Sequence, residues 1–373
     1  MNAEYWIWLG AIPEVTNKIF ASLLEQFGDP KEVFAAAKRD PGAIGFVGPK
    51  AAHAIRTHAD LKSLDAAVDA LKRFNIRAIL YGSPEYPIAV QNVYSPPPIL
   101  YVRGADISIH FEHSIAMVGS RNCSEYGRRC AFSIARDLAE HEITVVSGLA
   151  YGIDSESHKG ALSTQANIPT VCVLANGLDV PYPRAHAKLF AQILERGAAV
   201  SEYPPGYPAM SSNFPMRNRI ISALSHGVLV VEAPFQSGTK YTVDAALDLG
   251  LDVFAVPGNI DENLSQYPLE LIKLGAKLVT SAQDIIDVFP KWSKNISAKK
   301  HALLNSLAKK AATPANLSDE QAMIVVALSK NDLTTDDLIE ITNVPVRKLL
   351  IALTDLMNQN IIVKQISGHF TLL

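Results

Sequence analysis

The central part of the chain alternates short apolar runs with longer stretches of helical periodicity. Helical stretches lie near Glu125–Glu140, Asp154–Gln165, Arg184–Arg196, Asn218–Leu224, Thr239–Leu249 and Tyr267–Leu274. The apolar runs of strand length between residues 114 and 280 are Ser114–Gly119, Ile143–Ser147, Thr170–Ala175, Ala198–Glu202, Gly227–Glu232, Asp252–Pro257 and Lys277–Thr280. Short strands separated by such helices predict right-handed crossovers between parallel strands. We therefore predict an α/β fold with a Rossmann-like, doubly wound, mostly parallel sheet.

Shorter helical segments precede this region. The candidate helices are Asn17–Phe27, Lys31–Lys38 and Pro49–Ala59, and loops rich in glycine, aspartate and proline separate them. The glycines in Ile44–Lys50 are typical either of a helix-hairpin-helix turn, whose amides approach a phosphate, or of a plain helix-capping turn. Strands at Ala78–Tyr81 and Ile99–Val102 follow. These patterns predict a small helical domain over residues 1–70 and an extended Rossmann-like domain over 71–290.

The last part of the chain has a different pattern. The helical stretches are Asp319–Leu328, Thr335–Ile341 and Val346–Asn358, and two short β-runs, Ile361–Gln365 and His369–Leu372, surround Ser367-Gly368. Three helices and a terminal hairpin predict a winged-helix domain over residues 318–373. Residues 291–317 carry six lysines and no acid. We interpret them as a solvated basic linker, and a non-specific DNA contact is the alternative.

Charge is distributed unevenly along the chain. The net charge of −3 combines a neutral segment over residues 1–110, −6 over 111–290, +6 over 291–317 and −3 over 318–373. This distribution excludes a uniformly basic nucleic-acid binder. If the protein holds DNA, locally gathered cations and backbone amides must do so. The hydrophobic content of 48% excludes wholesale disorder.

The cysteines and the apolar runs bear on the compartment. Cys123, Cys130 and Cys172 form no CxxC pair and no Cys/His cluster, so we expect a reducing compartment and no structural zinc. Residues 1–13 do not have the pattern of a signal peptide, and no apolar run has the length of a membrane span. We predict a cytoplasmic protein without membrane, metal or cofactor.

Candidate binding residues follow the strands, because ligands of open parallel sheets bind beyond the carboxyl ends of the strands. Turns that lead into helix N-termini aim backbone amides at an anion, most naturally a phosphate. The segments in these positions are Gly119-Ser120-Arg121, Ser147-Gly148-Leu149-Ala150, Asn176-Gly177-Leu178-Asp179, Pro234–Lys240 and Pro257-Gly258-Asn259. The spacing predicts several phosphate-binding turns on one rim.

Cations accompany these turns. Arg121 occupies the place where a GxGxxG dinucleotide fingerprint needs a small residue. For Arg217-Asn218-Arg219 we expect a division of labour, in which one arginine is structural, paired with Glu202, and the other binds phosphate. Ser237-Gly238-Thr239-Lys240 is typical of a short phosphate cradle but lacks the Walker A spacing. Arg184 is either a DNA contact or simply exposed.

Catalytic motifs are not found. We expect Asp154 to cap a helix and His158, one turn later, to be a hydrogen-bonded packing residue. The sequence has no G-x-S-x-G elbow, no HExxH and no DxD-type acidic cluster. We therefore predict a binding protein and not an enzyme.

Several of these motifs together resemble one family. In order and spacing they are similar to DprA/Smf proteins over roughly residues 80–285. The segments that carry the resemblance are Val118–Arg121, Ser147–Asp154 with His158, Gly177-Leu178-Asp179 with Tyr182-Pro183, Ser201-Glu202-Tyr203, Phe214–Ile221, Val231-Glu232-Ala233 with Ser237-Gly238-Thr239, and Val253–Gly258. The helices over 1–70 resemble that family's SAM-like domain and the tail its winged helix. Thr239–Val243 and Glu262–Tyr267 depart from the usual family pattern.

The resemblance implies a homodimer that binds single-stranded DNA independently of sequence and protects it. It also implies loading of the RecA recombinase past single-strand-binding protein during natural transformation. The DNA-binding role carries over to Gly119, Ser120, Arg121, Ser147, Gly148, Arg184, Arg217, Asn218, Arg219, Ser237, Gly238, Thr239 and Lys240.

Two alternatives come from other classes. LOG-type nucleotide phosphoribohydrolases also place a glycine turn and a threonine after a strand, but Lys240-Tyr241-Thr242 supplies no acid where that chemistry needs one. A LOG-like nucleotide-binding sensor stays open. A transcription factor that reads duplex DNA needs a basic recognition face, and Val346–Asn358 offers only Arg347 and Lys348. We therefore interpret the tail as a protein-docking or regulatory module.

Overall fold

The central feature of the fold is one mixed sheet with the strand order β1-β2-β6-β5-β4-β3-β7-β8-β9. All neighbouring pairs from β6 to β9 are parallel, whereas β2 is antiparallel to both β1 and β6. The strands are β1 (Ile76–Leu80), β2 (Ile99–Gly104), β3 (Ser114–Val118), β4 (Thr144–Ser147), β5 (Thr170–Leu174), β6 (Ala198–Ser201), β7 (Gly227–Val230), β8 (Asp252–Ala255) and β9 (Lys277–Leu278). The predicted Rossmann-like, mostly parallel sheet is confirmed.

The computed structural model describes residues 2–40, 42–105, 111–289, 292, 317–328, 332–359, 361–364 and 369–372. The chain divides into two compact units, Met1–Val288 and Phe289–Leu373. The basic segment over 291–317 lies outside the described residues except for Trp292 and Leu317, and so do Ser367 and Gly368.

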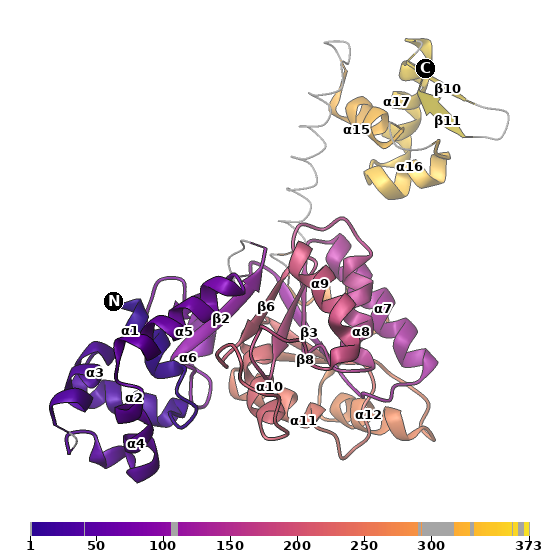
Figure 1. Ribbon diagram of the computed structural model, residues 1–373. Helices are drawn as coiled ribbons and strands as arrows, with labels where there is room; N and C mark the ends of the chain where they lie inside the picture. The colour runs from indigo at the N-terminus through magenta and orange to yellow at the C-terminus, as the bar shows by residue number, and fades with distance from the viewer. Residues whose placement is uncertain are drawn as a thin grey trace. The chain divides into compact units, whose positions relative to one another are not determined.

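Helices cover both faces of the sheet (Figure 1). On one face lie α7 (Glu125–Glu140), α8 (Ile153–Leu162) and α9 (Ala187–Arg196), joined by α13 (Ala282–Ile286). On the other lie α6 (Ile88–Gln91), α10 (Asn213–Ala223), α11 (Thr239–Asp248) and α12 (Gln266–Lys273). Every residue of β3 and β5 is buried, because a parallel strand between two helical layers has no solvent face.

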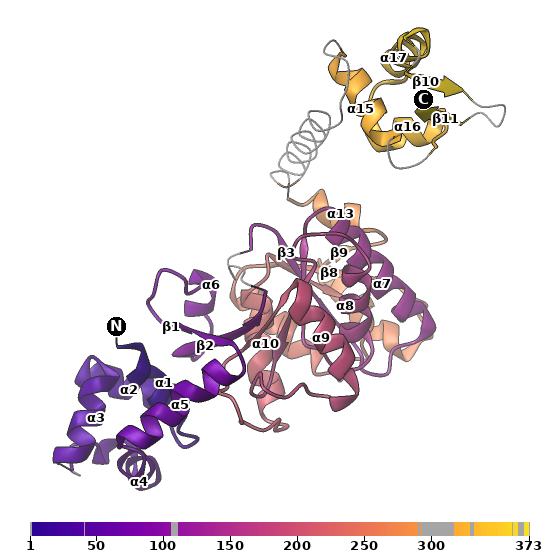
Figure 2. The same cartoon turned by 45° about the horizontal axis from the view of Figure 1, so that its top comes forward.

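The helical domain at the β1 side of the sheet contains more helices than the sequence pattern predicted. It consists of α1 (Ala3–Gly10), α2 (Asn17–Phe27), α3 (Pro30–Arg39), α4 (Pro49–Thr57) and α5 (Leu61–Arg73), and α1 and α5 lie beside β1 (Figure 2). Trp8 in α1 packs edge-on against Phe34 at 4.9 Å and donates its indole N–H to the His58 carbonyl. Because α1 is apolar on nearly all sides, it has no amphipathic period that would identify it as a helix.

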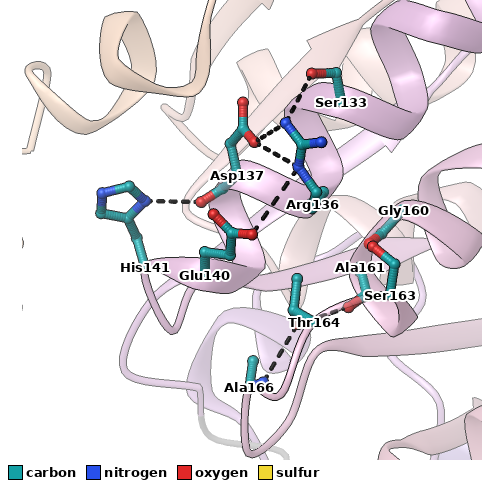
Figure 3. A network of polar contacts seen from close by, with 10 residues as sticks. All are labelled: Ser133, Arg136, Asp137, Glu140, His141, Gly160, Ala161, Ser163, Thr164 and Ala166. Atoms are coloured by element: carbon teal, nitrogen blue, oxygen red, sulfur yellow. Dashed lines mark hydrogen bonds and ion pairs between the residues drawn. The ribbon is translucent and has the colours of Figure 1, made fainter. Parts of the chain in front are cut away.

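Helices α7 and α8 follow the turns after β3 and β4, which were predicted to bind phosphate, and they pack against each other. Figure 3 shows their C-terminal ends, where Arg136 binds Asp137 and Glu140 along the exposed side of α7. The hydroxyl of Ser163 donates to the Gly160 carbonyl at 2.6 Å and closes the end of α8. Gly160 itself faces α7, and an added Cβ there would overlap the carbonyl oxygen of Phe132. The close packing of these two helices therefore depends on a residue without a side chain.

The second unit has the winged-helix architecture. Its helices are α15 (Asp319–Leu328), α16 (Thr335–Thr342) and α17 (Val346–Asn358), followed by the antiparallel strands β10 (Ile362–Lys364) and β11 (Phe370–Leu372). Leu338, Leu349 and Phe370 meet in its core. The Thr334 side chain and the Asp337 carboxylate cap the start of α16 reciprocally. In the part of the chain that the structure describes, no helix has the length and apolar character that crossing a bilayer requires.

The packing of α8 on α7 gives a first prediction. We expect Gly160→Ala to lower the free energy of unfolding by about 1–3 kcal/mol, because the methyl group forces the helices apart. Gly45→Ala is the matched control, since a Cβ on Gly45 meets no atom within 4 Å. Urea denaturation followed by circular dichroism measures both changes. Equal effects of the two substitutions would contradict the packing argument.

Candidate nucleic-acid interface

The strand order changes direction between β3 and β7. From β3 the chain continues to β4, β5 and β6 on one side, and from β7 to β8 and β9 on the other. Such a switch point opens a crevice at the carboxyl ends of its two central strands. The segments there are Gly119-Ser120-Arg121 after β3 and Pro234–Thr239 after β7. Two of the predicted turns therefore meet at this crevice.

A pocket of about 580 Å³ occupies the crevice. Of the residues predicted to bind DNA, those that line it are Gly119, Ser120, Arg121, Arg217, Asn218, Ser237, Gly238 and Thr239. The structure thus brings together residues that lie more than 100 positions apart in the sequence. Ser147, Gly148, Arg184, Arg219 and Lys240 are not among its lining residues.

Arg121 is the exposed cation of this pocket and has an aromatic neighbour. Its guanidinium carbon lies 5.1 Å from the centre of the Phe214 ring, and the ring of Tyr182 lies 5.6 Å from that of Phe214. A guanidinium over a ring keeps its N–H groups free at its edge for a phosphate. Phe214 and Tyr182 are thus site residues that sequence reasoning did not identify. The signal was present, because both lie in segments that carry the family resemblance.

The turn after β7 forms the other side of the pocket. The Ser237 hydroxyl accepts the Thr239 amide at 3.2 Å and donates to the Thr239 hydroxyl at 3.0 Å. The space beside the Gly238 Cα is open, since a Cβ added there would have no atom within 4 Å. The side chain of Asn218 donates to the Gly238 carbonyl at 3.4 Å. Lys240 is exposed on α11 outside the pocket, where its charge can act only at longer range.

The turn after β4 does not expose amides as predicted. The Ser147 hydroxyl donates to the Met117 carbonyl at 2.6 Å inside the sheet. The amides of Gly148 and Ala150 donate to one carboxylate oxygen of Asp154 at 3.1 and 3.2 Å. The prediction of a phosphate cradle at Ser147-Gly148 is therefore wrong, because a buried carboxylate already occupies the position of the anion.

Asp154 also differs from its expected role. Gly152 is the N-cap of α8 and Asp154 caps no helical amide; it closes the preceding loop instead. Burial raises the pKa of the Asp154 carboxyl, while the charge of Arg217 and the two amides oppose this rise. A carboxylate that accepts two amides and lies near a guanidinium stabilises the loop that it binds.

The two arginines of α10 do not divide their roles as expected. Arg219 donates to a carboxylate oxygen of Glu202 at 2.7 Å and to the Ser95 carbonyl at 2.9 Å, so the predicted pairing with Glu202 is confirmed. Arg217, however, is also buried, and its guanidinium donates to the carbonyls of Gly148 and Val173. Neither arginine is exposed as the phosphate-binding role requires, because both side chains are buried and donate to carbonyl or carboxylate oxygens, although Arg219 Nε and Nη1 have no partner among the described residues. Arg217 contributes a fixed positive charge at the pocket wall.

Arg184 and His158 complete the predicted set. Arg184 is exposed at the start of a short 3₁₀ turn, Arg184–His186, and both interpretations of it stay open. His158 is buried, and its Nδ1 lies 2.6 Å from the Thr170 hydroxyl, which confirms the packing role. Burial lowers the pKa of His158 to about 3, so the folded protein holds it neutral.

No group of His, Cys, Asp and Glu among the described residues could hold a metal ion. Of the described residues that line the pocket, Asp154 is the one carboxylate. The arrangement provides one exposed cation, an aromatic wall and a glycine turn at a helix N-terminus, which together suit an anion attached to a flat apolar group.

Two family models match the chain. Residues 77–290 match DNA recombination-mediator protein A, and residues 308–356 match the DprA winged helix domain. The chain is 44% identical to Protein Smf of Escherichia coli over 229 residues, 61% of this chain and 60% of that protein, so it spans less than two thirds of that relative's length. It is 33% identical to Putative DNA processing protein DprA of Mycobacterium tuberculosis over 298 residues, 77% of this chain and 75% of that protein.

Two solved structures are similar as well. The structure of DNA processing protein A from Streptococcus pneumoniae has a TM-score of 0.66 and 33% identity, and covers 76% of this chain and 97% of that one. A structure of DNA processing protein A from Helicobacter pylori, described for its single-stranded DNA binding mode, has a TM-score of 0.52 and 26% identity over 58% of this chain and 97% of that one.

The buried ion pair gives a second prediction. We expect Arg219→Met to lower the free energy of unfolding by about 3–5 kcal/mol, because Glu202 is left charged and buried. The double variant Glu202→Leu with Arg219→Met is the control, and we expect it to recover a large part of that loss. Chemical denaturation of the two single variants and the double variant gives the coupling energy. Additive losses would show that the pair does not act as a unit.

The buried imidazole predicts a pH dependence. Because the pKa of His158 is about 3 in the folded protein and about 6.5 in an unfolded chain, the unfolded state alone takes up its proton between these values. The contribution of the neutral His158 to the free energy of unfolding is fully present above pH 6.5 and is lost as the pH falls towards 3. Between pH 7 and pH 5 we expect a loss of about 2 kcal/mol from this group. The side chain of the variant His158→Asn cannot titrate. In a denaturation series over the same pH range, we expect the free energy of unfolding of this variant to fall by about 2 kcal/mol less than that of the unchanged protein.

Proposed function

The chain belongs to the DprA/Smf family, and from this premise we propose that it binds single-stranded DNA without reading its sequence. We further propose that it protects incoming DNA and loads a RecA recombinase past single-strand-binding protein during natural transformation. The single observation that carries the DNA-binding proposal is the switch-point pocket, in which the exposed Arg121 lies beside the Phe214 ring. A guanidinium for the phosphate and a ring for a base are the two elements that single-strand binders combine.

The form of the ligand follows from the shape of the site. A volume of about 580 Å³ accommodates a nucleotide whose base has left its stack, which a flexible single strand provides readily. In duplex DNA the bases are paired and their faces are covered by neighbours. The turn Ser237-Gly238-Thr239 and the helix N-terminus behind it favour an anion without distinguishing bases. These features support binding that depends on phosphate and stacking.

The winged helix supports a role in protein contacts. On α17, Arg347 and Lys348 are both exposed, and Lys348 is paired with Glu320 at 2.8 Å. The same helix exposes Val346, Leu350 and Ile351, each at about half of its surface. Exposed apolar side chains on a helix favour contact with a protein rather than with a phosphate backbone. We therefore assign the recombinase-dependent steps to this unit.

A homodimer is part of the proposal. β9 is an edge strand of the sheet, and Leu278 on it and Leu274 before it are exposed at 45% and 75%. Ile260, in the loop that follows β8, is exposed at 89%. An edge strand beside exposed apolar residues favours self-association of equivalent surfaces.

We propose that the protein performs no catalysis and acts in the cytoplasm. The carboxylate nearest the pocket, Asp154, is engaged by amides, and Glu232 accepts the amide and hydroxyl of Ser124 at 2.8 and 2.5 Å. A phosphoribohydrolase of the LOG type needs a free carboxylate at the sugar, so these contacts favour the binding protein over that alternative. Free cysteines at 123, 130 and 172 agree with a reducing compartment.

Arg121 gives the central prediction. We expect Arg121→Ala to weaken binding of oligo-dT about tenfold or more, because a charge-assisted contact with phosphate contributes about 1.5–3 kcal/mol. Arg347→Ala is the matched control: it removes another exposed arginine, from the winged helix, and is expected to leave affinity for oligo-dT unchanged. Fluorescence anisotropy at several salt concentrations, with blunt duplex as the competitor, measures both. Equal affinity for duplex and single strand would overturn the proposed ligand, and unchanged oligo-dT affinity in a folded Arg121→Ala protein would remove Arg121 from the site.

A shortened chain separates the domains. We expect a protein that ends at Thr313, which keeps the lysines of the basic segment, to bind oligo-dT about as well as the full chain. The removed part has a net charge of −3 over residues 318–373, so its loss removes no net attraction to phosphate. We expect the shortened chain to fail in recombinase loading on DNA coated with single-strand-binding protein. Loss of oligo-dT affinity in a folded shortened chain would place the DNA site in the winged helix.

A further inference from the structure

The loop that carries Arg121 is short and joins the end of β3 to the start of α7. It runs from Gly119 to Ser124, and Arg121 and Asn122 are exposed on it. An exposed cation binds a phosphate best when the backbone beneath it is already fixed, because ordering a mobile loop on binding costs free energy. The contacts that hold this loop therefore affect the affinity of the switch-point pocket.

One buried residue, Glu232, binds the loop on both sides of Arg121. It lies just after the end of β7 and is 4% exposed. Its backbone carbonyl accepts the Ser120 amide at 2.6 Å. Its carboxylate accepts the Ser124 amide at 2.8 Å on Oε2 and the Ser124 hydroxyl at 2.5 Å on Oε1. The main chain and the side chain of a single residue thus hold the positions before and after Arg121.

Two glycines leave room for the tight packing around this loop. A Cβ on Gly127, in the first turn of α7, would overlap Oε2 of Glu232, and a Cβ on Gly152 would overlap the Ser120 carbonyl oxygen. Directly after Gly152, the Ile153 amide donates to the same Ser120 carbonyl at 3.2 Å. The loop is therefore packed between the end of β7 and the start of α8.

The carboxylate of Glu232 does not face the pocket. Neither Glu232 nor Ser124 is among the residues that line it. The carboxylate lies instead at the N-terminus of α7, where Ser124 is the N-cap residue. A carboxylate in this position is stabilised by the helix dipole and repels a phosphate from the same place. Any effect of Glu232 on DNA binding therefore has to be indirect.

We propose that Glu232 is a positioning residue, which fixes the loop that presents Arg121 to a phosphate through its contacts with Ser120 and Ser124. This inference rests on the proposed function and extends it to a residue outside the pocket. The charge of Glu232 and its contacts predict opposite effects. A buried negative charge near the site repels a polyanion, so its neutralisation alone raises affinity. Loss of the contacts that place Arg121 lowers affinity.

A first pair of variants separates the contacts from the charge. Glu232→Gln and Glu232→Ala remove the same charge, but glutamine keeps both contacts with Ser124, because a serine hydroxyl can accept a hydrogen bond as well as donate one. We expect Glu232→Gln to bind oligo-dT at least as tightly as the unchanged protein. We expect Glu232→Ala to bind about five- to tenfold more weakly than Glu232→Gln, since the loop is then ordered only on binding. Fluorescence anisotropy measures affinity, and circular dichroism and thermal melting show that each variant is folded.

The same pair in an Arg121→Ala background shows whether the loss of affinity depends on Arg121. If Glu232 acts by placing that arginine, removing the contacts has little further effect once the arginine is gone. We therefore expect the difference between Glu232→Ala and Glu232→Gln to shrink below about twofold in this background. A change that only loosens the domain weakens binding by the same factor in both backgrounds.

A pair of serine variants repeats the test without the cavity that Glu232→Ala leaves. Ser124→Ala removes the hydroxyl that donates to Glu232. Its matched control, Ser114→Ala, removes a hydroxyl that donates to the Leu224 carbonyl at 2.9 Å, at the opposite end of β3. We expect Ser124→Ala to weaken oligo-dT binding about threefold, the factor that one hydrogen bond provides, and Ser114→Ala to leave it unchanged.

The outcomes separate this inference from the proposed function. Losses in Glu232→Ala and Ser124→Ala that disappear in the Arg121→Ala background support the inference. Equal affinities of Glu232→Gln and Glu232→Ala, or equal losses in both backgrounds, overturn it and leave the proposed function standing. If Glu232→Ala does not fold, the serine pair in the two backgrounds decides in the same way. Absence of oligo-dT binding to the unchanged protein overturns the proposed function itself.

Discussion

The guanidinium of Arg217 joins three segments at the carboxyl edge of the sheet. It donates from α10 to the Gly148 carbonyl after β4 and to the Val173 carbonyl within β5, and the Asp154 carboxylate lies nearby and holds the same loop by its amides. A buried charge of this kind is stable only with all its partners present. Since Phe214 is one turn before Arg217 on the same helix, this interaction also sets where the aromatic wall meets Arg121.

A second buried arginine connects the sheet to the helical domain. Glu202 binds Arg219 on α10 and Asn17 at the start of α2, while Arg219 also reaches the Ser95 carbonyl. The two arginines of one helix thus hold two different parts of the first unit. Of the cations that the sequence offers for DNA, Arg217 and Arg219 are thus used inside the fold. This leaves exposed cations such as Arg121 to meet phosphate, in agreement with a chain whose net charge is −3.

The separation of tasks between the units follows from the same charges. The α/β domain offers a concave site with an exposed arginine and aromatic rings, which suits a flexible polyanion that also presents flat bases. The winged helix offers exposed apolar side chains on α17 and a paired lysine. Burying such apolar side chains against a protein partner contributes more binding free energy than placing them beside phosphates.

The sequence by itself determined the alternation of strands and helices, and hence the Rossmann-like sheet, because hydrophobic periodicity is local. It also placed Gly119–Arg121 directly after one strand and Ser237–Thr239 in the loop between another strand and its helix, where a ligand-binding rim was expected. It missed α1, whose apolar residues show no face, and it placed the start of α10 five residues too late, at Asn218 instead of Asn213. Only the tertiary structure decided the strand order that brings β3 next to β7. The tertiary structure also decided which polar groups remain free for a ligand. The Gly148 amide donates to Asp154, and Arg217 donates to carbonyls that are distant in the sequence, so no local pattern could show that these groups are already bonded.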